Sequence, residues 1–396
     1  MTRSIASIDG LFDKCVGCGA CSVACPVSAI EMSRDVEGFD MPVVDSAVCV
    51  ECGKCLKVCQ LVQEPGIVQP LAVAGMKAKD EDIRAAGSSG GIIGLLSRAA
   101  LDDGGAVFGA VFDAAHKSLS HECCESIGGL GPLLRSKYIQ SAAWGVYGEV
   151  RARLAGGQRV LFCGTPCQVA GLKLFLGRDY DGLLTVDFFC HGVPSPGFFR
   201  SYAESVEAAE GSDLVDVTFR EKKSGWREQH IRWYFADGEV KEEPSLDNSH
   251  YFFFFLHNYS LRKSCLNCTL SHCHQADLTV ADWWLVDKSI DDDRGISLIL
   301  TNTDRGEDAV SSIDALVDVF NVDSFDFSIY SHSYDGGKRD EFFTALKEGG
   351  VEYVCGHYFE REHAVKQRKQ RLDRLRGMLL AVPRKTIRVL AGKSRH

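Results

Sequence analysis

The pattern of apolar positions predicts alternating strands and helices beyond about residue 70. Leu71 to Ala78 alternates enough for a strand, and Ile92 to Leu101 is apolar enough for a buried helix. Continuous apolar runs over Gln158 to Cys163 and Leu183 to Phe189 predict two buried strands, each followed by a turn and a helix. Two such units in series are typical of parallel strands in an α/β sheet.

Before residue 70, cysteines dominate the pattern. They occur twice with the spacing C-x2-C-x2-C-x3-C, and Pro26 follows the first run where Gln60 follows the second. This is the spacing of bacterial ferredoxins, in which three thiolates surround one [4Fe–4S] cluster and the fourth binds the other cluster. Small residues such as Gly19 and Gly53 suit the tight turns of such loops. We therefore predict cluster one on Cys15, Cys18, Cys21 and Cys59, and cluster two on Cys49, Cys52, Cys55 and Cys25.

The alternative to two clusters is a pair of structural zinc knots, which also use C-x2-C pairs. Zinc does not explain a doubled run of four cysteines with the same internal spacing. More than 300 residues follow the two runs, so we expect the module to carry electrons to or from another site.

These patterns divide the chain into a module, a body and a tail. The module covers residues 1–64, and a linker with Pro65, Gly66 and Pro70 follows. We predict an α+β ferredoxin-like N-terminal module followed by an α/β body with a mixed sheet. The body has parts 71–150 and 151–330, and a basic helical tail covers 331–396. The remaining expected elements are helices over Asp80 to Ala86, Val169 to Leu176, from Gly197, and over Glu307 to Leu316; a hairpin of Ile231 to Phe235 with Glu239 to Glu242; and strands over Asp277 to Ala281 and Ile296 to Asn302.

Charge and composition narrow the class of partner. A formal net charge of -10 argues against nucleic acid, because phosphate binding needs clustered Lys and Arg. From Arg361 to His396 there are 12 Lys and Arg against 2 acidic residues, which suits contact with a membrane surface or an acidic partner. The same composition is also compatible with a solvated helix that packs on the body.

The compartment follows from what the sequence lacks. Met1 to Phe12 has no apolar core of a secretory signal, and the apolar run Tyr251 to Leu256 is too short to span a bilayer. We therefore expect a soluble, cytoplasmic protein. In a reducing compartment, 17 cysteines point to metal or redox chemistry rather than to disulfides.

Three loops of the body have ligand-binding character. Gly87 to Gly91 is a Ser/Gly turn that opens a helix, where free N–H groups favour a flavin or nucleotide phosphate. A simple capping turn has the same sequence. The loops Gly164 to Gln168 and Cys190 to Pro196 follow predicted parallel strands, and ligands bind at the carboxyl ends of such strands.

Together these motifs resemble the coenzyme F420 hydrogenase/dehydrogenase family of beta subunits, in which a two-cluster ferredoxin precedes an FAD-binding α/β body. One departure is Asp282-Trp283-Trp284-Leu285, where the family has Asp-Phe-Trp-Gly. The motifs that carry the resemblance are Ser88-Ser89-Gly90-Gly91, Ser136-Lys137-Tyr138-Ile139-Gln140-Ser141, the segment from Leu161 to Gln168, the segment from Cys190 to Ser195, the segment from Ser264 to Cys268, and the segment from Asp277 to Trp284.

The resemblance implies a flavoenzyme that passes electrons between clusters and FAD. FAD would exchange a hydride with the deazaflavin coenzyme F420 or with another small organic donor or acceptor. A redox partner protein would meet the ferredoxin module. A non-catalytic electron relay within a larger complex and a polysaccharide-associated relative with another substrate are the alternatives. The implied FAD contacts are Ser88, Ser89, Gly90, Gly91, Ser136, Lys137, Tyr138, Gln140, Thr165, Pro166 and Gln168.

Four further cysteines, on separate loops of the body, are candidates for a third [4Fe–4S] cluster: Cys167, Cys190, Cys265 and Cys268. Cys273 could replace one of them. The alternatives are zinc on Cys265, Cys268 and Cys273 with His272 or His274, and simple buried thiols.

The remaining candidates have ordinary structural explanations. His191 is a candidate proton shuttle, and Lys137 could neutralise a reduced flavin, but hydride transfer needs neither. The aromatic run Phe252 to Phe255 is expected in the core. Packed thiols rather than ligands are expected at Cys123, Cys124, Cys163 and Cys355.

Overall fold

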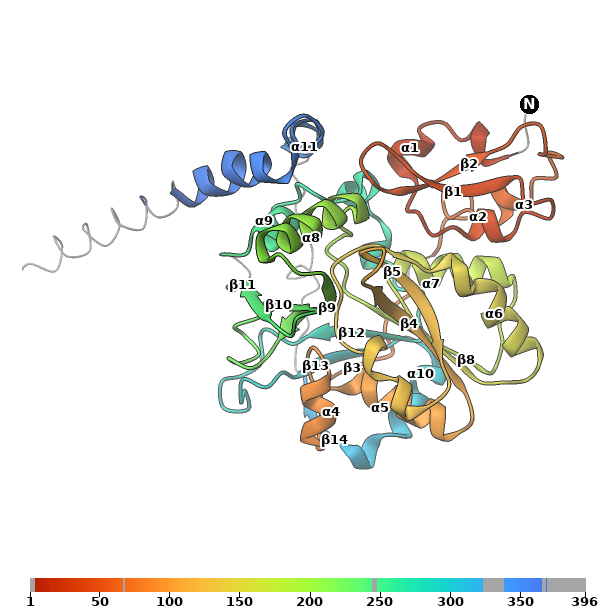
Figure 1. The fold of residues 1–396 in the computed structure, drawn as a ribbon. Helices are drawn as coiled ribbons and strands as arrows, with labels where there is room; N and C mark the ends of the chain where they lie inside the picture. The colour runs from red at the N-terminus through yellow and green to blue at the C-terminus, as the bar shows by residue number, and fades with distance from the viewer. Residues whose placement is uncertain (1–3, 67, 244–247, 323–337, 365–367, 369–396) are drawn as a thin grey trace, which may run out of the picture. The chain divides into compact units, whose positions relative to one another are not determined.

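The computed structural model describes residues 4–66, 68–243, 248–322, 338–364 and 368, and the chain forms two compact units, residues 1–343 and 344–396. In the first unit, nine strands form one sheet in the order β14-β3-β13-β12-β8-β7-β4-β5-β6 (Figure 1). Their bounds are β3 Ala72–Ala78, β4 Ala106–Asp113, β5 Ser118–Cys124, β6 Ser141–Ala142, β7 Val160–Cys163, β8 Leu183–Phe188, β12 Leu278–Asp282, β13 Ser297–Thr301 and β14 Val317–Asn321.

The sheet is mixed, as predicted. Strands β4, β7, β8 and β12 are parallel neighbours, and β13 is antiparallel to both β12 and β3. Strand β3 therefore runs in the same direction as these four. The carboxyl ends of all five strands meet at one edge of the sheet, where loops with ligand-binding sequences follow β3, β7 and β8.

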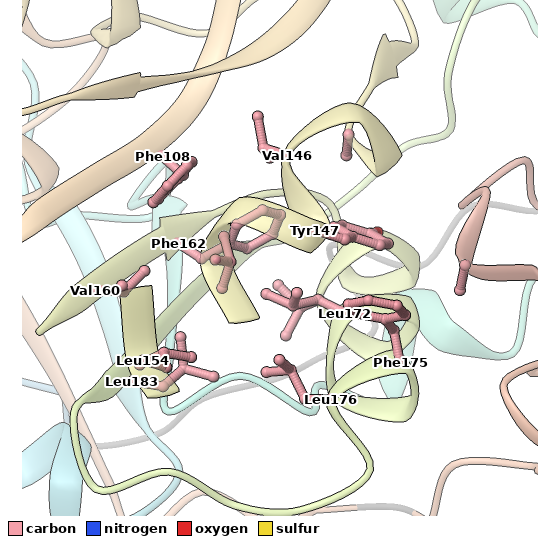
Figure 2. Packing of buried hydrophobic residues seen from close by; sticks show 14 of the residues in the cluster. Phe108, Val146, Tyr147, Leu154, Val160, Phe162, Leu172, Phe175, Leu176 and Leu183 are labelled. Carbon is pink, nitrogen blue, oxygen red and sulfur yellow. The ribbon is translucent and has the colours of Figure 1, made fainter. Parts of the chain in front are cut away.

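Helices cover both faces of this sheet. On β7, Phe162 packs with α6 (Trp144–Ala155) and α7 (Pro166–Leu176), as Figure 2 shows. Its neighbour Leu161 points to the opposite face and packs with α5 (Ile92–Asp102). Because both neighbours are fully buried, the strand reads as a continuous apolar run, as expected for a parallel sheet.

A second sheet carries an aromatic core. It contains β9 (Leu214–Glu221), β10 (His230–Phe235) and β11 (Val240–Glu243) in the order β11-β10-β9. Rings from α8 (Pro196–Glu210) and α9 (His250–Leu256) pack on it, and Tyr251 lies 5.4 Å from Phe199 between ring centroids. Burial of Phe252 to Phe255 confirms that the aromatic run belongs to the core.

The N-terminal module is a two-stranded antiparallel sheet with short helices. The strands are β1 (Ile30–Arg34) and β2 (Asp40–Val44). The helices are α1 (Leu11–Lys14), α2 (Ala20–Val23) and α3 (Lys54–Lys57). Gly19 and Gly53 begin α2 and α3 at φ of 68° and 69°, a conformation that strongly favours glycine. The sequence repeat is thus also a structural repeat.

Most predicted elements are present, with different ends. Helix α7 begins at Pro166, three residues early, because Thr165 and Gln168 form a capping box. The expected helix over Glu307 to Leu316 is wrong as one element, because α10 (Asp304–Ser311) ends and a 3₁₀ turn follows. The expected boundary at residue 150 lies inside α6, and strands from both predicted parts share the large sheet.

Two further helices complete the description. They are α4 (Glu81–Ala86), which Asp80 caps, and α11 (Arg339–Val354), which Gly350 interrupts. None of the described helices is long and apolar enough to cross a membrane. Most of the basic tail lies outside the described residues.

Candidate functional site

Two cavities in the N-terminal module are lined by cysteines. The first gathers the four cysteines predicted for cluster one, together with apolar side chains such as Leu11 and Val58. Burial raises the pKa of Cys18 to about 12, so its thiol is protonated unless a metal displaces the proton. The four cysteines of this cavity are Cys15, Cys18, Cys21 and Cys59.

The second cavity gathers the four cysteines predicted for cluster two: Cys25, Cys49, Cys52 and Cys55. Cys25 belongs to the first repeat and the other three to the second, so each repeat contributes a cysteine to its neighbour's cavity. Cys52 is exposed, and so are the lining residues Val27 and Val50. This cavity therefore has an apolar rim at the surface.

Four loop cysteines of the body converge beside the first cavity. Burial raises the pKa of Cys190, and Cys265, Cys167 and Cys268 add to the rise in that order. The charge of Cys167 also raises the pKa of Cys18, so this group lies next to the cavity that contains Cys18. The structure thus brings together all four cysteines predicted for a third cluster, and Cys273 lies near Cys268.

Side chains around this group hold the module against the body. The amide of Gln60 donates to the main-chain carbonyl of Cys167 at 2.7 Å, and Gln140 donates to that of Val16 at 2.9 Å. Ser264 donates to the carbonyl of Cys15 at 3.0 Å, and Arg262 donates to that of Asp40. These contacts fix the two cysteine groups relative to each other.

In the described part of the chain, no three Cys, His, Asp or Glu side chains are grouped closely enough to share one metal ion. A tetrahedral zinc site would bring its sulfurs within about 4 Å of each other. In a cubane each thiolate binds a different iron, so the sulfurs stay further apart. The residue His274 has another partner, because its Nδ1 lies 3.0 Å from Asp187 Oδ1.

The predicted FAD contacts fall into two groups, and the first surrounds the Ser/Gly turn. Ser88 accepts a 2.6 Å hydrogen bond from the main-chain N–H of Ser136, which joins two of the predicted segments. Gly91, at φ of 83°, begins α5 without a side-chain cap. The first N–H groups of this helix are therefore available to an anion. Lys137 also lies in this region, and its ammonium donates to the carbonyls of Leu134 and Arg135.

The second group of predicted FAD contacts lies at α7 and the module. Thr165 and Gln168 cap α7, and Gln168 also donates to the main-chain carbonyl of Ser141. Pro166 is buried in the first turn of this helix, while Gln140 contacts the module as described above. These four side chains thus have structural partners. Tyr138 is half-buried within an aromatic group, and its main-chain carbonyl accepts a hydrogen bond from Tyr251.

Sequence reasoning missed a cluster of cations beside the Ser/Gly turn. Lys222, just beyond β9, donates to the carbonyls of Arg84, Ser89 and Arg294. Its pKa is lowered to about 7, first by burial and then by Arg220, Arg84 and Arg135. The only signal was a Thr-Phe-Arg-Glu-Lys stretch with alternating cations at the end of a strand. Three arginines thus surround Lys222, and each is itself paired with a carboxylate: Arg84 with Asp292, Arg220 with Asp282 and Arg135 with Glu221.

The other candidates have mixed outcomes. Burial lowers the pKa of Lys137 to about 8. The ring of His191 lies 4.9 Å from that of Phe255, and the catalytic roles of His191 and Lys137 stay predictions. Cys124 is buried and donates to Ser126, as expected for a packed thiol.

An α/β body joined to a module with two four-cysteine cavities defines an iron–sulfur electron-transfer protein. Residues 14–61 match the 4Fe-4S dicluster domain, which confirms the iron–sulfur prediction. Residues 157–324 match the family model for the C terminus of the coenzyme F420 hydrogenase/dehydrogenase beta subunit. The chain is therefore similar to the C-terminal part of that beta subunit over residues 157–324, behind a dicluster domain, and the resemblance predicted from the motifs is confirmed.

Known proteins that are similar to this chain include a dehydrogenase subunit and a chain of a hydrogenase complex. The F subunit of the F(420)H(2) dehydrogenase of Methanosarcina mazei is 24% identical over 257 residues, which is 60% of this chain and 69% of that protein. A chain in the xenon-derivatised F420-reducing [NiFe] hydrogenase complex from Methanosarcina barkeri is 18% identical, with a TM-score of 0.47. That alignment covers 71% of this chain and 93% of the other.

Proposed function

We propose that this chain is an FAD- and iron–sulfur-dependent oxidoreductase that moves electrons between a partner protein and a small organic acceptor. The observation that carries the proposal is a continuous series of cysteine groups. It begins at the cavity with exposed Cys52, continues through the cavity that contains Cys18, and reaches Cys167 and Cys190 at the carboxyl edge of the sheet. No separate function would require thiols in that order.

In this proposal the eight module cysteines hold two [4Fe–4S] clusters with the exchanged fourth ligand described above. A third cluster would bind between the module and the body, on Cys167, Cys190, Cys265 and Cys268. Hydrogen bonds to sulfur, such as the one from the Ala29 N–H to Cys25 at 3.2 Å, would tune the cluster potentials.

The Ser/Gly turn and the adjacent cations would hold the FAD pyrophosphate. The uncapped N-terminus of α5 presents N–H donors, and Lys222 and Arg135 add positive charge. When bound, FAD exchanges hydride with organic molecules and single electrons with clusters. The residues of this chain would position the ring and exclude water.

The partners follow from the chemistry of the two ends. The apolar rim of Val27 and Val50 at the outer cavity suits docking of a redox protein. At the other end, similarity to a protein named as part of an F(420)H(2) dehydrogenase supports a deazaflavin as the organic electron donor or acceptor. We therefore place coenzyme F420 first among the candidates.

The test is the iron, sulfide, zinc and flavin content per chain after anaerobic purification. About twelve irons with one FAD would support all three clusters and the flavoenzyme. About eight irons with one FAD would show that the third cluster is absent and would leave the rest of the proposal standing. Eight irons without flavin would overturn the oxidoreductase proposal and favour a non-catalytic electron relay.

A further inference from the structure

Arg220 is a buried cation with unused hydrogen-bond donors. It is 3% exposed, and its Nη1 donates to Asp282 Oδ2 at 2.6 Å. Its Nε and Nη2 atoms are also buried and make no hydrogen bond of ordinary geometry to the described residues, although the Tyr138 hydroxyl lies close enough to interact with the guanidinium. A buried donor without an acceptor is destabilising, and more so when it is charged. An acceptor from outside the chain would remove that cost.

Aromatic side chains connect Arg220 to the third cysteine group. The Tyr138 side chain lies close enough to Arg220 to influence its charge, and its ring is 5.3 Å from that of Phe255. The Phe255 ring is in turn 4.9 Å from that of His191, which follows Cys190. Trp284 completes the aromatic surroundings, with its ring centroid 5.8 Å from the Arg220 guanidinium. Arg220 is therefore bordered by aromatic rings that lead toward the proposed third cluster.

The side of this site near Lys222 is polar rather than aromatic. Lys222 lies two residues after Arg220 and reaches the Ser89 carbonyl at 3.0 Å, next to the turn proposed for phosphate. Arg220 and Lys222 lie close enough for their charges to repel each other. The site thus has a phosphate end at Lys222 and a redox end at Arg220, in the order that FAD would need.

We propose that Arg220 binds the pyrimidinedione edge of the flavin ring through its Nε and Nη2 atoms. This inference rests on the proposed function, in which the chain binds FAD. Two electrons and one proton convert the oxidised ring into a reduced ring with negative charge at this edge. The planar guanidinium can make two parallel hydrogen bonds there, which an ammonium group cannot. Arg220 therefore favours the reduced flavin over the oxidised flavin.

The test compares R220K, R220Q and wild type, each with intact iron content and cluster spectra. R227K is the matched control, because Arg227 is an exposed arginine of the next loop, paired with Asp291. Flavin-free protein is titrated with FAD, with riboflavin, which lacks the pyrophosphate, and with ADP, which lacks the ring. We expect R220K to bind FAD and riboflavin about tenfold more weakly and to bind ADP normally. Preference for the reduced ring should also fall about tenfold, which lowers the two-electron potential by about 30 mV.

The outcomes separate the two proposals. Wild-type protein that binds no FAD would overturn both. Wild type that binds FAD, with R220K and R220Q unchanged in FAD affinity and potential, would overturn the role of Arg220 alone. Equal weakening of ADP and riboflavin would also overturn it, because that pattern assigns Arg220 to the phosphates or to the fold. A loss confined to a deazaflavin probe would place Arg220 at the acceptor and overturn its contact with FAD. R220Q is included with R220K so that the test does not depend on a single variant, which could fail to fold.

Discussion

The side-chain amide of Gln60 donates a 2.7 Å hydrogen bond to the main-chain carbonyl of Cys167. Gln60 follows Cys59 in the second cysteine repeat, whereas Pro26 follows Cys25 in the first. Proline has no side-chain donor. Because of this difference between the repeats, the hydrogen bond to the body is made beside the proposed cluster that contains Cys59.

Replacing Gln60 by leucine should loosen this connection. The variant keeps much of the side-chain volume but loses this hydrogen bond, which contributes about 0.5–1.5 kcal/mol. We expect a lower unfolding temperature and slower electron transfer from the module to the third group, with unchanged iron in the module. Anaerobic calorimetry and stopped-flow reduction measure these two effects. The control P26A alters the equivalent position at the outer cavity, and an equal effect there would contradict the assignment.

The exchanged cysteines give a second prediction. C25S and C52S should damage the same cluster although they lie in different repeats, and C59S and C18S should damage the other. Each variant should lose up to about four irons and one distinct EPR signal. The control C123S changes a cysteine outside every cavity described above and should keep all the iron. If C25S instead removes the signal lost in C18S, each repeat holds its own cluster.

The sequence predicted the parts of the molecule that depend on local spacing. The cysteine runs, the α/β body and the Ser/Gly turn follow from residues close together in the chain. The cation cluster could not be predicted, because Arg84 and Arg135 lie far in sequence from Arg220 and Lys222. The same is true of Gln140, which the motif assigned to FAD and which the structure shows bonded to the module at Val16. Tertiary contacts decide such roles, and spacing alone does not encode them.

A third prediction concerns the surface of α7 that faces the module. A Cβ atom at Gly171 would lie 3.0 Å from the Cys18 sulfur, closer than packed atoms normally approach. We expect G171A to destabilise the docked module by about 1–3 kcal/mol, as overpacking usually does. Gly148 in α6 is the matched control, because a Cβ there meets nothing within 4 Å.

Calorimetry and iron content distinguish the two glycine variants. G148A should be neutral or stabilised by up to about 1 kcal/mol, because alanine favours helix more than glycine does. G171A should unfold at lower temperature and lose iron from the cluster that contains Cys18 first. If both variants behave alike, α7 and the module are not in close contact in solution.

The last prediction uses the lowered pKa of Lys222. Burial, Arg220, Arg84 and Arg135 bring this pKa to about 7, and Asp282 acts weakly in the opposite direction. A bound anion favours the protonated form, so binding takes up a proton. Affinity should therefore be constant below about pH 6 and fall as pH rises through 7, by up to tenfold per unit.

The measurement is the dissociation constant of ADP between pH 5.5 and 8 for wild type and K222Q. Lys137, with a pKa of about 8, adds to the fall only at the upper end of this range. K222Q should bind weakly with little pH dependence, and K222R should bind tightly with little pH dependence, because arginine stays charged. K223Q changes an exposed neighbour and should behave as wild type. A wild-type slope that survives in K222Q would assign the titration to another group.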